Sequence, residues 1–156
     1  RVGGAFKLNS TCLPEKFKAR MERELGGEYG AATGRPRRVG PFDVVASRYG
    51  IRCQGADEIA LTKLDVLDDY EEIELCTHYE LDGKILDEFP FTDVLDYCKP
   101  VFEKVKGWNC DITGCKKPED LPKEALDYIK LLEKLCDCRI RYVSVGAERE
   151  ACIKMY

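Results

Sequence analysis

The alternation of strand-like apolar runs with an amphipathic helical segment is the feature that most constrains the fold. Residues 121–135, LPKEALDYIKLLEKL, predict a helix because apolar side chains recur at helical spacing and Pro122 suits the first turn. A short apolar run at residues 59–61 precedes this helix, and residues 139–146, RIRYVSVG, follow it as a closing strand. Strands that alternate with helices predict an α/β fold in which at least part of the sheet is parallel.

Two further helices are predicted nearer the N-terminus. Residues 13–25, LPEKFKARMEREL, predict a helix that ends at the glycine pair directly after it. Residues 41–54 predict a second helix, with Pro41 at its start and Gly55 closing it. The glycine- and arginine-rich residues 26–38 between them are expected to form a loop.

A β-hairpin is predicted in the middle of the chain. Residues 71–86, EEIELCTHYELDGKIL, carry Asp82-Gly83 between two strand-like runs, and this pair is typical of a type I′ turn. Residues 98–108, CKPVFEKVKGW, predict a further strand. Pro100 lacks a backbone N–H, so this strand is expected at a sheet edge, or to carry Pro100 at its start.

The composition is that of an ordinary globular protein. A chain of 156 residues fits one domain, and its 44% hydrophobic and 35% charged residues argue against disorder. No apolar run approaches the roughly 20 residues that cross a bilayer. The N-terminal sequence RVGGAFKLN has neither an initiator methionine nor a signal peptide, so we expect a processed chain or part of a longer one. A net charge of −4 disfavours general nucleic-acid binding.

The nine cysteines do not form a metal-binding pattern. They are odd in number and scattered, no Cys-x-x-Cys pair occurs, and His78 is the single histidine. We therefore expect reduced, mostly buried thiols of the kind found in cytosolic proteins. The cysteines are Cys12, Cys53, Cys76, Cys98, Cys110, Cys115, Cys136, Cys138 and Cys152.

Lys63 and Asp65 follow the apolar run at residues 59–61. An aspartate can accept from both the ring N–H and the exocyclic amine of guanine, which adenine does not offer in that arrangement. The lysine stem can lie across the base while its ammonium reaches an oxygen. The alternative is a solvated charged pair at a strand end.

Ser144, Val145 and Gly146 end the closing strand. A small residue and a glycine allow a flat ring to approach the backbone closely, although an ordinary turn is the favoured explanation of these residues taken alone. Ligands of α/β sheets bind beyond the carboxyl ends of the strands. Lys63 and Asp65 are therefore expected at the same edge as these three residues.

The stretch GGEYGAATGRPRR, residues 26–38, fits an anion-binding loop. Its glycines at positions 30 and 34 allow backbone N–H groups to face an anion, and Arg35 and Arg37 flank Pro36, which restricts the local backbone. Arginine suits bidentate capture of a carboxylate or phosphate. A solvated basic loop is the alternative. Neither a Walker A loop nor G-x-G-x-x-G occurs in the chain.

Several motifs occur in a distinctive order along the chain. They are GEYGAATGRPRRVGPFDVVASRYGIR, ALTKLDVLD, YELDGK, KGW, LPKEALDYIKLLE and SVGAERE, with RVGG at the start. This order resembles the C-terminal part of the adenylosuccinate synthetase family over nearly the whole chain, with TGRPRR and TKLDVLD the most specific pieces. The resemblance implies one C-terminal segment, residues 1–156, holding part of a P-loop-NTPase-like mixed sheet with flanking helices and a β-hairpin, without its N-terminal portion.

The resemblance also implies an activity. The family joins IMP to L-aspartate with GTP and Mg²⁺ to form adenylosuccinate in purine nucleotide synthesis, on the way to AMP. GTP phosphorylates the 6-oxygen of IMP, and the aspartate amine then displaces phosphate. It implies a cytoplasmic enzyme that is a homodimer at full length, with no nucleic-acid or membrane partner.

By the same resemblance, residues 30–38 form a loop over the aspartate carboxylates, where Arg35 also touches IMP and Arg37 reaches towards GTP. Residues 59–68 form a guanine-binding strand end, and residues 144–149 form a guanine-contacting loop. The residues implied at aspartate and IMP are Ala31, Ala32, Thr33, Gly34, Arg35, Pro36 and Arg37. The residues implied at GTP are Arg37, Lys63, Leu64, Asp65, Ser144, Val145 and Gly146.

The chain departs from the family pattern at three places. Ala32 precedes Thr33 where the family commonly has two threonines, so one hydroxyl contact is missing. AFKLNSTCLPE follows the glycine-rich start, where the family usually has a Pro-Phe-Pro segment and an acidic residue. Pro41 stands where the family often has tryptophan.

The family's phosphate-binding glycine loop, aspartate base, histidine acid and Mg²⁺ ligands belong to its N-terminal part, and none of those motifs occurs here. We therefore assign no catalytic residue and no metal ligand, and we expect the isolated chain to be inactive. His78 is expected at the surface or in packing. Two alternatives are a non-catalytic guanine-nucleotide-binding module and RNA binding through Arg35, Arg37 and Arg38.

Overall fold

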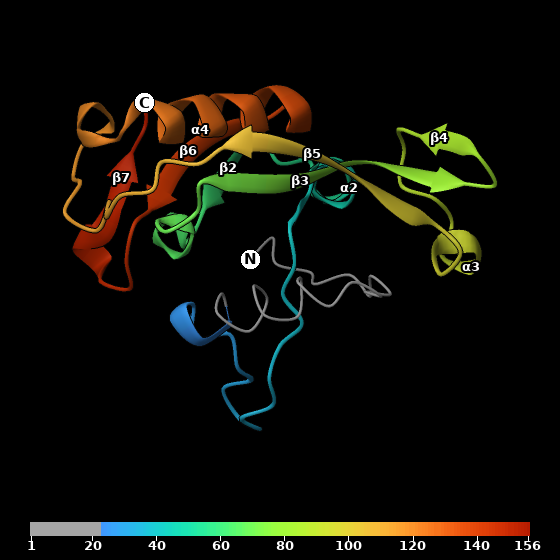
Figure 1. Ribbon diagram of the computed structural model, residues 1–156, viewed down its shortest axis with the longest axis horizontal. Coiled ribbons are helices and arrows are strands. Elements are labelled where there is room, and N and C mark those ends of the chain that lie inside the picture. Colours follow the sequence, from blue (N-terminus) through green and yellow to red (C-terminus); the bar gives the residue numbers. More distant parts are fainter. Residues whose placement is uncertain (1–22) are drawn as a thin grey trace.

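The computed structural model describes residues 23–156, which form two β-sheets with helix α4 (Lys123–Cys136) lying along one side of them (Figure 1). The chain therefore has the mixed α/β fold that the sequence predicts, with both parallel and antiparallel strand pairs. No helix within these residues has the length and apolar character needed to cross a membrane.

The smaller sheet has the strand order β2 (Glu58–Leu61), β6 (Arg139–Ser144), β7 (Cys152–Lys154). Strands β2 and β6 are parallel, which confirms the expected parallel pairing. The sequence identified β6 as the closing strand, and this was wrong. After a bend the chain returns as β7, which pairs antiparallel with β6 and covers its other edge.

The larger sheet is built around β3 (Glu72–Leu81). Strand β1 (Phe42–Asp43) pairs with it in parallel, and β4 (Lys84–Leu86) and β5 (Lys99–Lys106) pair antiparallel. The predicted hairpin is confirmed, because the turn between β3 and β4 has φ of 50° at Asp82 and 75° at Gly83, as a type I′ turn requires.

Pro100 lies within β5, as the sequence allowed for an edge strand. It faces Tyr79 of β3, and among the described strands β5 pairs with β3 alone. No described strand lies along the other edge of β5, so no backbone hydrogen bond on that side requires the N–H that proline lacks.

Helix α2 (Val44–Gln54) begins three residues later than predicted. Phe42 and Asp43 are extended and form β1, and the Asp43 carboxylate accepts a hydrogen bond from the backbone N–H of Ala46 at 2.9 Å. This N-cap starts the helix after Asp43 rather than at the proline. Gly55 ends it in the left-handed conformation, with φ of 60°, as expected.

Helix α4 also begins later than predicted. Pro122 is the extended residue before the helix rather than part of its first turn. Of the helix predicted over residues 13–25, residues 13–22 lie outside the described part of the chain, and residues 23–25 are helical and end before the two glycines. The remaining short helices are α3 (Thr92–Leu95), η1 (Leu64–Leu67), η2 (Pro118–Asp120) and η3 (Arg149–Ala151).

The main core lies between α4 and the two sheets. Ile129 and Leu132 of α4 are at most 1% exposed and pack with fully buried residues of both sheets, among them Leu75 and Ile140. Leu64, at the start of η1, is 2% exposed and belongs to the same core. Burying side chains of this size contributes roughly 1.5–3 kcal/mol each, so η1 is held firmly at the end of β2.

Asp68 fixes the segment after η1 against the loop that follows β5. Its Oδ1 accepts from the indole Nε1 of Trp108 at 2.7 Å, and its Oδ2 accepts from the backbone N–H of Ile112 at 3.0 Å. Burial raises the pKa of this carboxyl group, although both hydrogen bonds act in the opposite direction. Trp108 packs edge-on against Tyr128 of α4, with ring centroids 5.9 Å apart.

We expect Asp68→Ala to lower the free energy of unfolding by about 1–3 kcal/mol, because two donors would lose their acceptor in a partly buried site. Urea denaturation measures the change. The matched control is Asp69→Ala, which removes an exposed carboxylate next to it and should change stability by less than about 0.5 kcal/mol. Equal losses in the two variants would show that Asp68 has no special role.

Candidate functional site

The candidate site lies at the edge where β2 and β6 both end. Leu61 of β2 is in register with Val143 of β6, so the residues after both strands meet there. The backbone N–H of Lys63 donates to the Ser144 hydroxyl at 2.8 Å, which joins positions 81 residues apart. The structure thus confirms that these two predicted site residues lie at one sheet edge.

Lys63 makes the turn that leads out of β2. Its φ of 62° lies in the left-handed region, which is uncommon for a residue other than glycine, asparagine or aspartate. The chain then enters η1, and Asp65 stands in the first turn of that short helix. A strained backbone at a strand end is a common feature of ligand sites, because the surrounding packing holds it in place.

Asp65 has a carboxylate oxygen without a protein partner. Its Oδ1 is buried and forms no hydrogen bond with any of residues 23–156. A buried acceptor left in this way costs about 1–3 kcal/mol, so a donor from a bound molecule would be stabilising. The guanine ring N–H and exocyclic amine are donors of the required kind.

Leu64 and Val145, predicted at the nucleotide, direct their side chains elsewhere. Leu64 is 2% exposed and Val145 is 0% exposed, and both belong to the main core. The N–H of Val145 donates to the carbonyl of Ala151 at 2.8 Å. These two residues therefore position the backbone at the sheet edge, and they offer no side chain to a ligand.

Gly146 lies where the chain bends back towards β7. A Cβ on this residue would approach the Cβ of Ala151 to 3.1 Å, which is closer than ordinary contact. The packing against Ala151 therefore accounts for a glycine here even before any ligand is considered. Glycine therefore has a structural reason here, and its missing Cβ would also allow a flat ring to approach the backbone closely.

The arginine-rich loop is a narrow hairpin. Tyr29 and Pro36 face each other in an isolated bridge, and Gly34 adopts φ of 62° at the turn. We expected the N–H groups of Gly30 and Gly34 to face an anion, and this is wrong. The Gly30 N–H donates to the carbonyl of Arg35, and the Gly34 N–H donates to the carbonyl of Gly30, each at 2.8 Å.

The tip of this hairpin carries the residues predicted to hold aspartate. All six residues from Ala31 to Pro36 are exposed, and Arg35 forms no ion pair within residues 23–156. The hydroxyl of Thr33 accepts from the backbone N–H of Arg35 at 3.4 Å, a weak contact within the turn. The side-chain charge of Arg35 is thus available to an anionic ligand.

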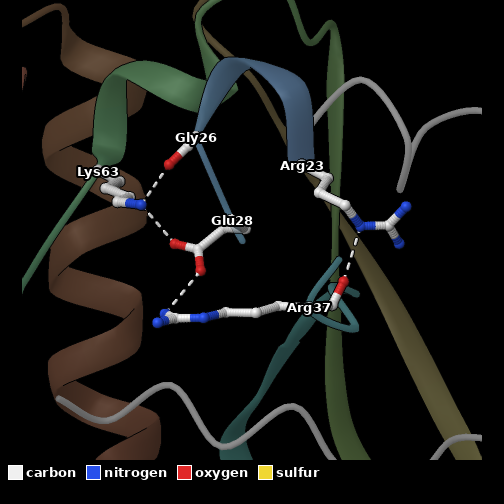
Figure 2. Close-up of polar contacts among 5 residues, drawn as sticks. All are labelled: Arg23, Gly26, Glu28, Arg37 and Lys63. Carbon is white, nitrogen blue, oxygen red and sulfur yellow. Dashed lines mark hydrogen bonds and ion pairs between the residues drawn. The ribbon is translucent and has the colours of Figure 1, made fainter. Parts of the chain in front are cut away.

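Glu28 is a site residue that the sequence reasoning missed. Figure 2 shows its carboxylate between Lys63 and Arg37: Oε2 pairs with Arg37 Nη1 at 3.1 Å, and Oε1 accepts from Lys63 Nζ. Lys63 Nζ also donates to the carbonyl of Gly26, and Arg23 Nε donates to the carbonyl of Arg37 at 2.7 Å. A lone carboxylate within a basic loop was the signal that could have identified it.

Glu28 thereby links two predicted half-sites. The hydrogen bond from Lys63 is the largest of the effects that hold the pKa of Glu28 below its usual range, and Arg37 adds to it, while partial burial opposes both. The carboxylate therefore stays charged at neutral pH. The Glu28 carboxylate thus fastens the arginine loop to the end of β2, together with the hydrogen bond from Lys63 to the carbonyl of Gly26.

His78 lies on β3, where its Nε2 is 3.2 Å from Asp87 Oδ1, in keeping with the surface or packing role expected for it. Within residues 23–156 no group of three or more His, Cys, Asp or Glu side chains could hold a metal ion.

The cysteines of the described chain are free, as expected, but the expectation that most of them are buried was wrong. Cys76, Cys136 and Cys138 are buried, whereas the other five described cysteines are exposed or partly exposed. Cys12 lies outside the described residues, and the other eight form no disulfide. Burial raises the pKa of Cys76 to about 12 and that of Cys136 to about 11, so both remain neutral thiols.

The parallel strand pair with polar residues beyond its carboxyl ends is typical of α/β proteins, in which ligands commonly bind at that edge of the sheet. The adenylosuccinate synthetase family model matches residues 3–153 of the chain. The chain belongs to the adenylosuccinate synthetase family.

Known relatives agree with this assignment. The adenylosuccinate synthetase of Geotalea uraniireducens is 49% identical over 134 residues, covering 85% of this chain and 31% of the relative. That of Gloeothece citriformis is 48% identical, covering 98% of this chain and 36% of the relative. The solved structure of fully ligated adenylosuccinate synthetase from Plasmodium falciparum matches with a TM-score of 0.83 and 37% identity, covering 88% of this chain and 34% of that one. The chain thus spans about a third of the length of these relatives.

The contribution of Glu28 to stability should depend on pH. Because its pKa is lowered on folding, the contribution is fully present above the ordinary glutamate range and is lost as the pH falls through the lowered value. We expect Glu28→Gln to reduce the free energy of unfolding by about 1 kcal/mol or less at pH 7, since the pair is partly exposed.

Urea denaturation of wild type and Glu28→Gln across the acid range checks this expectation. The difference between the two proteins should stay constant near neutrality and shrink towards zero in acid. Glu24→Gln is the control, because Glu24 accepts from the Tyr29 hydroxyl at 2.6 Å and contacts neither Arg37 nor Lys63 in the described structure. A difference that grows in acid would refute the assignment.

Proposed function

We propose that this chain is the C-terminal portion of a GTP-dependent ligase that joins IMP to L-aspartate, forming adenylosuccinate in the synthesis of AMP. In that enzyme it supplies a guanine-binding and an aspartate-binding half-site. One observation carries the proposal: the buried, unpartnered Asp65 oxygen stands two residues after Lys63, where two parallel strands end. Membership of the family supports the same function.

In the guanine half-site, residues 59–68 and 144–149 enclose the base. The Asp65 carboxylate accepts from the guanine ring N–H and exocyclic amine, and the Lys63 stem lies along the ring. Ser144 holds the Lys63 backbone through its 2.8 Å hydrogen bond. Leu64, Val145 and Gly146 contribute backbone surface, which agrees with the burial of the Leu64 and Val145 side chains.

In the aspartate half-site, residues 30–38 form the binding loop. Arg35 is exposed and can take a carboxylate with two parallel N–H bonds, and it also reaches IMP. Arg37 lies nearer the body of the protein, paired with Glu28, and extends towards GTP. Ala32 offers no hydroxyl, so the neighbouring Thr33 supplies the side-chain oxygen of this turn.

We propose that the chain alone lacks the groups that transfer phosphate. Phosphoryl transfer depends on positioning and on neutralising the charge of the γ-phosphate. The described residues offer no cluster that fits Mg²⁺, so we propose that the ion binds to other parts of the enzyme. We further propose that the full enzyme is a cytoplasmic homodimer and that the 156-residue chain is inactive by itself.

Turnover is the first test. The 156-residue chain mixed with IMP, GTP, Mg²⁺ and L-aspartate should form no adenylosuccinate, whereas the full polypeptide that contains it should form the product. A coupled assay for phosphate release or product absorbance measures both. Product formed by the isolated chain would contradict the half-site proposal.

Base selectivity is the second test. Asp65→Asn replaces an acceptor oxygen with an NH₂ group facing the guanine donors, so we expect GDP affinity to fall by roughly 10- to 100-fold in the full polypeptide. ADP binding, weak in wild type, should not change. Calorimetry with both nucleotides measures the preference, and Asp69→Asn is the control on the same segment. Retained guanine preference in Asp65→Asn would exclude Asp65 as the base reader.

A further inference from the structure

Glu28 is held in place at its backbone as well as at its carboxylate. Its N–H donates to the carbonyl of Arg23 and its carbonyl accepts from the N–H of Arg37, each at 2.9 Å. Its side chain is 24% exposed, while that of Lys63 is 45% exposed. An exposed ion pair contributes little because both long side chains must be held in one geometry, whereas here the carboxylate is partly buried and its backbone is already fixed.

Each carboxylate oxygen of Glu28 serves a different segment. One oxygen pairs with Arg37 on the arginine loop. The other accepts from Lys63, which follows β2 and lies 35 residues after Glu28 in the chain (Figure 2). The contact with Arg37 uses Nη1, so the guanidinium has further donors that can face a ligand. Without this carboxylate, two cations would lie close together with no charge between them.

We propose that Glu28 is a positioning residue that orients Arg37 and Lys63 together, so that the arginine loop and the guanine-reading edge are set as one unit. This inference rests on the proposed function, in which the two cations belong to different half-sites. When a ligand fixes the side chain of one cation, the shared carboxylate of Glu28 also restricts the side chain of the other cation. Binding of the guanine nucleotide then strengthens binding of the dicarboxylate, and the reverse holds by thermodynamic reciprocity.

The expected effect falls on binding rather than on the chemical step. Glu28 fixes side chains that must otherwise be ordered when ligand binds, and ordering two long cationic side chains weakens affinity. Glu28 is not placed at the transferred phosphate or at the attacking amine. Its loss should therefore raise KM for both ligands and leave kcat nearly unchanged.

The test uses the full polypeptide that contains this chain, with the variants Glu28→Gln, Glu28→Asp and Glu24→Gln. For Glu28→Gln we expect KM for GTP and for L-aspartate each to rise about tenfold, with kcat within about twofold of wild type. In wild type, saturating L-aspartate should lower KM for GTP, and this dependence should largely disappear in Glu28→Gln.

The other two variants separate positioning from simple loss of charge or stability. Glu24→Gln removes one negative charge from the same segment and should behave as wild type. Glu28→Asp keeps the charge but is one methylene shorter, so it should raise both KM values less than Glu28→Gln does. If Glu28→Gln does not fold, the comparison of Glu28→Asp with Glu24→Gln decides the matter, because wild-type behaviour of both would overturn the proposal.

Three results would overturn the inference. One is a Glu28→Gln enzyme that matches Glu24→Gln in both KM values. Another is a loss of kcat with unchanged KM, and the third is a dependence of GTP binding on L-aspartate that survives in Glu28→Gln. Failure of the proposed function is a separate outcome, since the wild-type polypeptide would then form no adenylosuccinate at all.

Discussion

The parallel pairing of β2 with β6 is the constraint on which the candidate site depends. A parallel pair requires a long crossover, which here includes β3, β4, β5 and α4, and it places the carboxyl ends of both strands at one edge. Ile140 and Val143 of β6 are fully buried, so a shift of register would expose apolar area and is resisted. The buried residues of β6 thus favour the register in which Lys63 and Ser144 meet.

A second constraint, electrostatic in origin, attaches the arginine loop to this edge. The loop has few buried apolar residues, and its hydrogen bonds are mostly within its own hairpin. The Glu28 carboxylate links the loop to Lys63, directly before η1. Asp68, directly after η1, accepts a hydrogen bond from Trp108. Three residues thus hold the predicted guanine-reading segment in place. The buried side chain of Leu64 anchors it in the core, and the carboxylates of Glu28 and Asp68 bind groups on either side of it in the sequence.

Local patterns in the sequence predicted most of the fold, and contacts between distant segments were the part they could not predict. The hairpin at Asp82 and the parallel β2–β6 pair follow from turn chemistry and from strand–helix alternation, both readable over short windows. Strand β7 is three residues long and gave no such signal. The role of Glu28 depends on Lys63 lying beside the loop, which no spacing rule specifies.

The burial pattern along the site explains why position in the sequence alone was a poor guide to individual roles. In the run Lys63-Leu64-Asp65, the middle side chain enters the core while its neighbours remain at the edge, and Val145 does the same between Ser144 and Gly146. Changes at the buried positions act on stability through packing, whereas changes at their neighbours act on charge and hydrogen bonding. Such a division lets the core fix the backbone of the proposed ligand site while leaving its polar side chains at the sheet edge, and Glu28 connects that edge to a loop that the core does not reach.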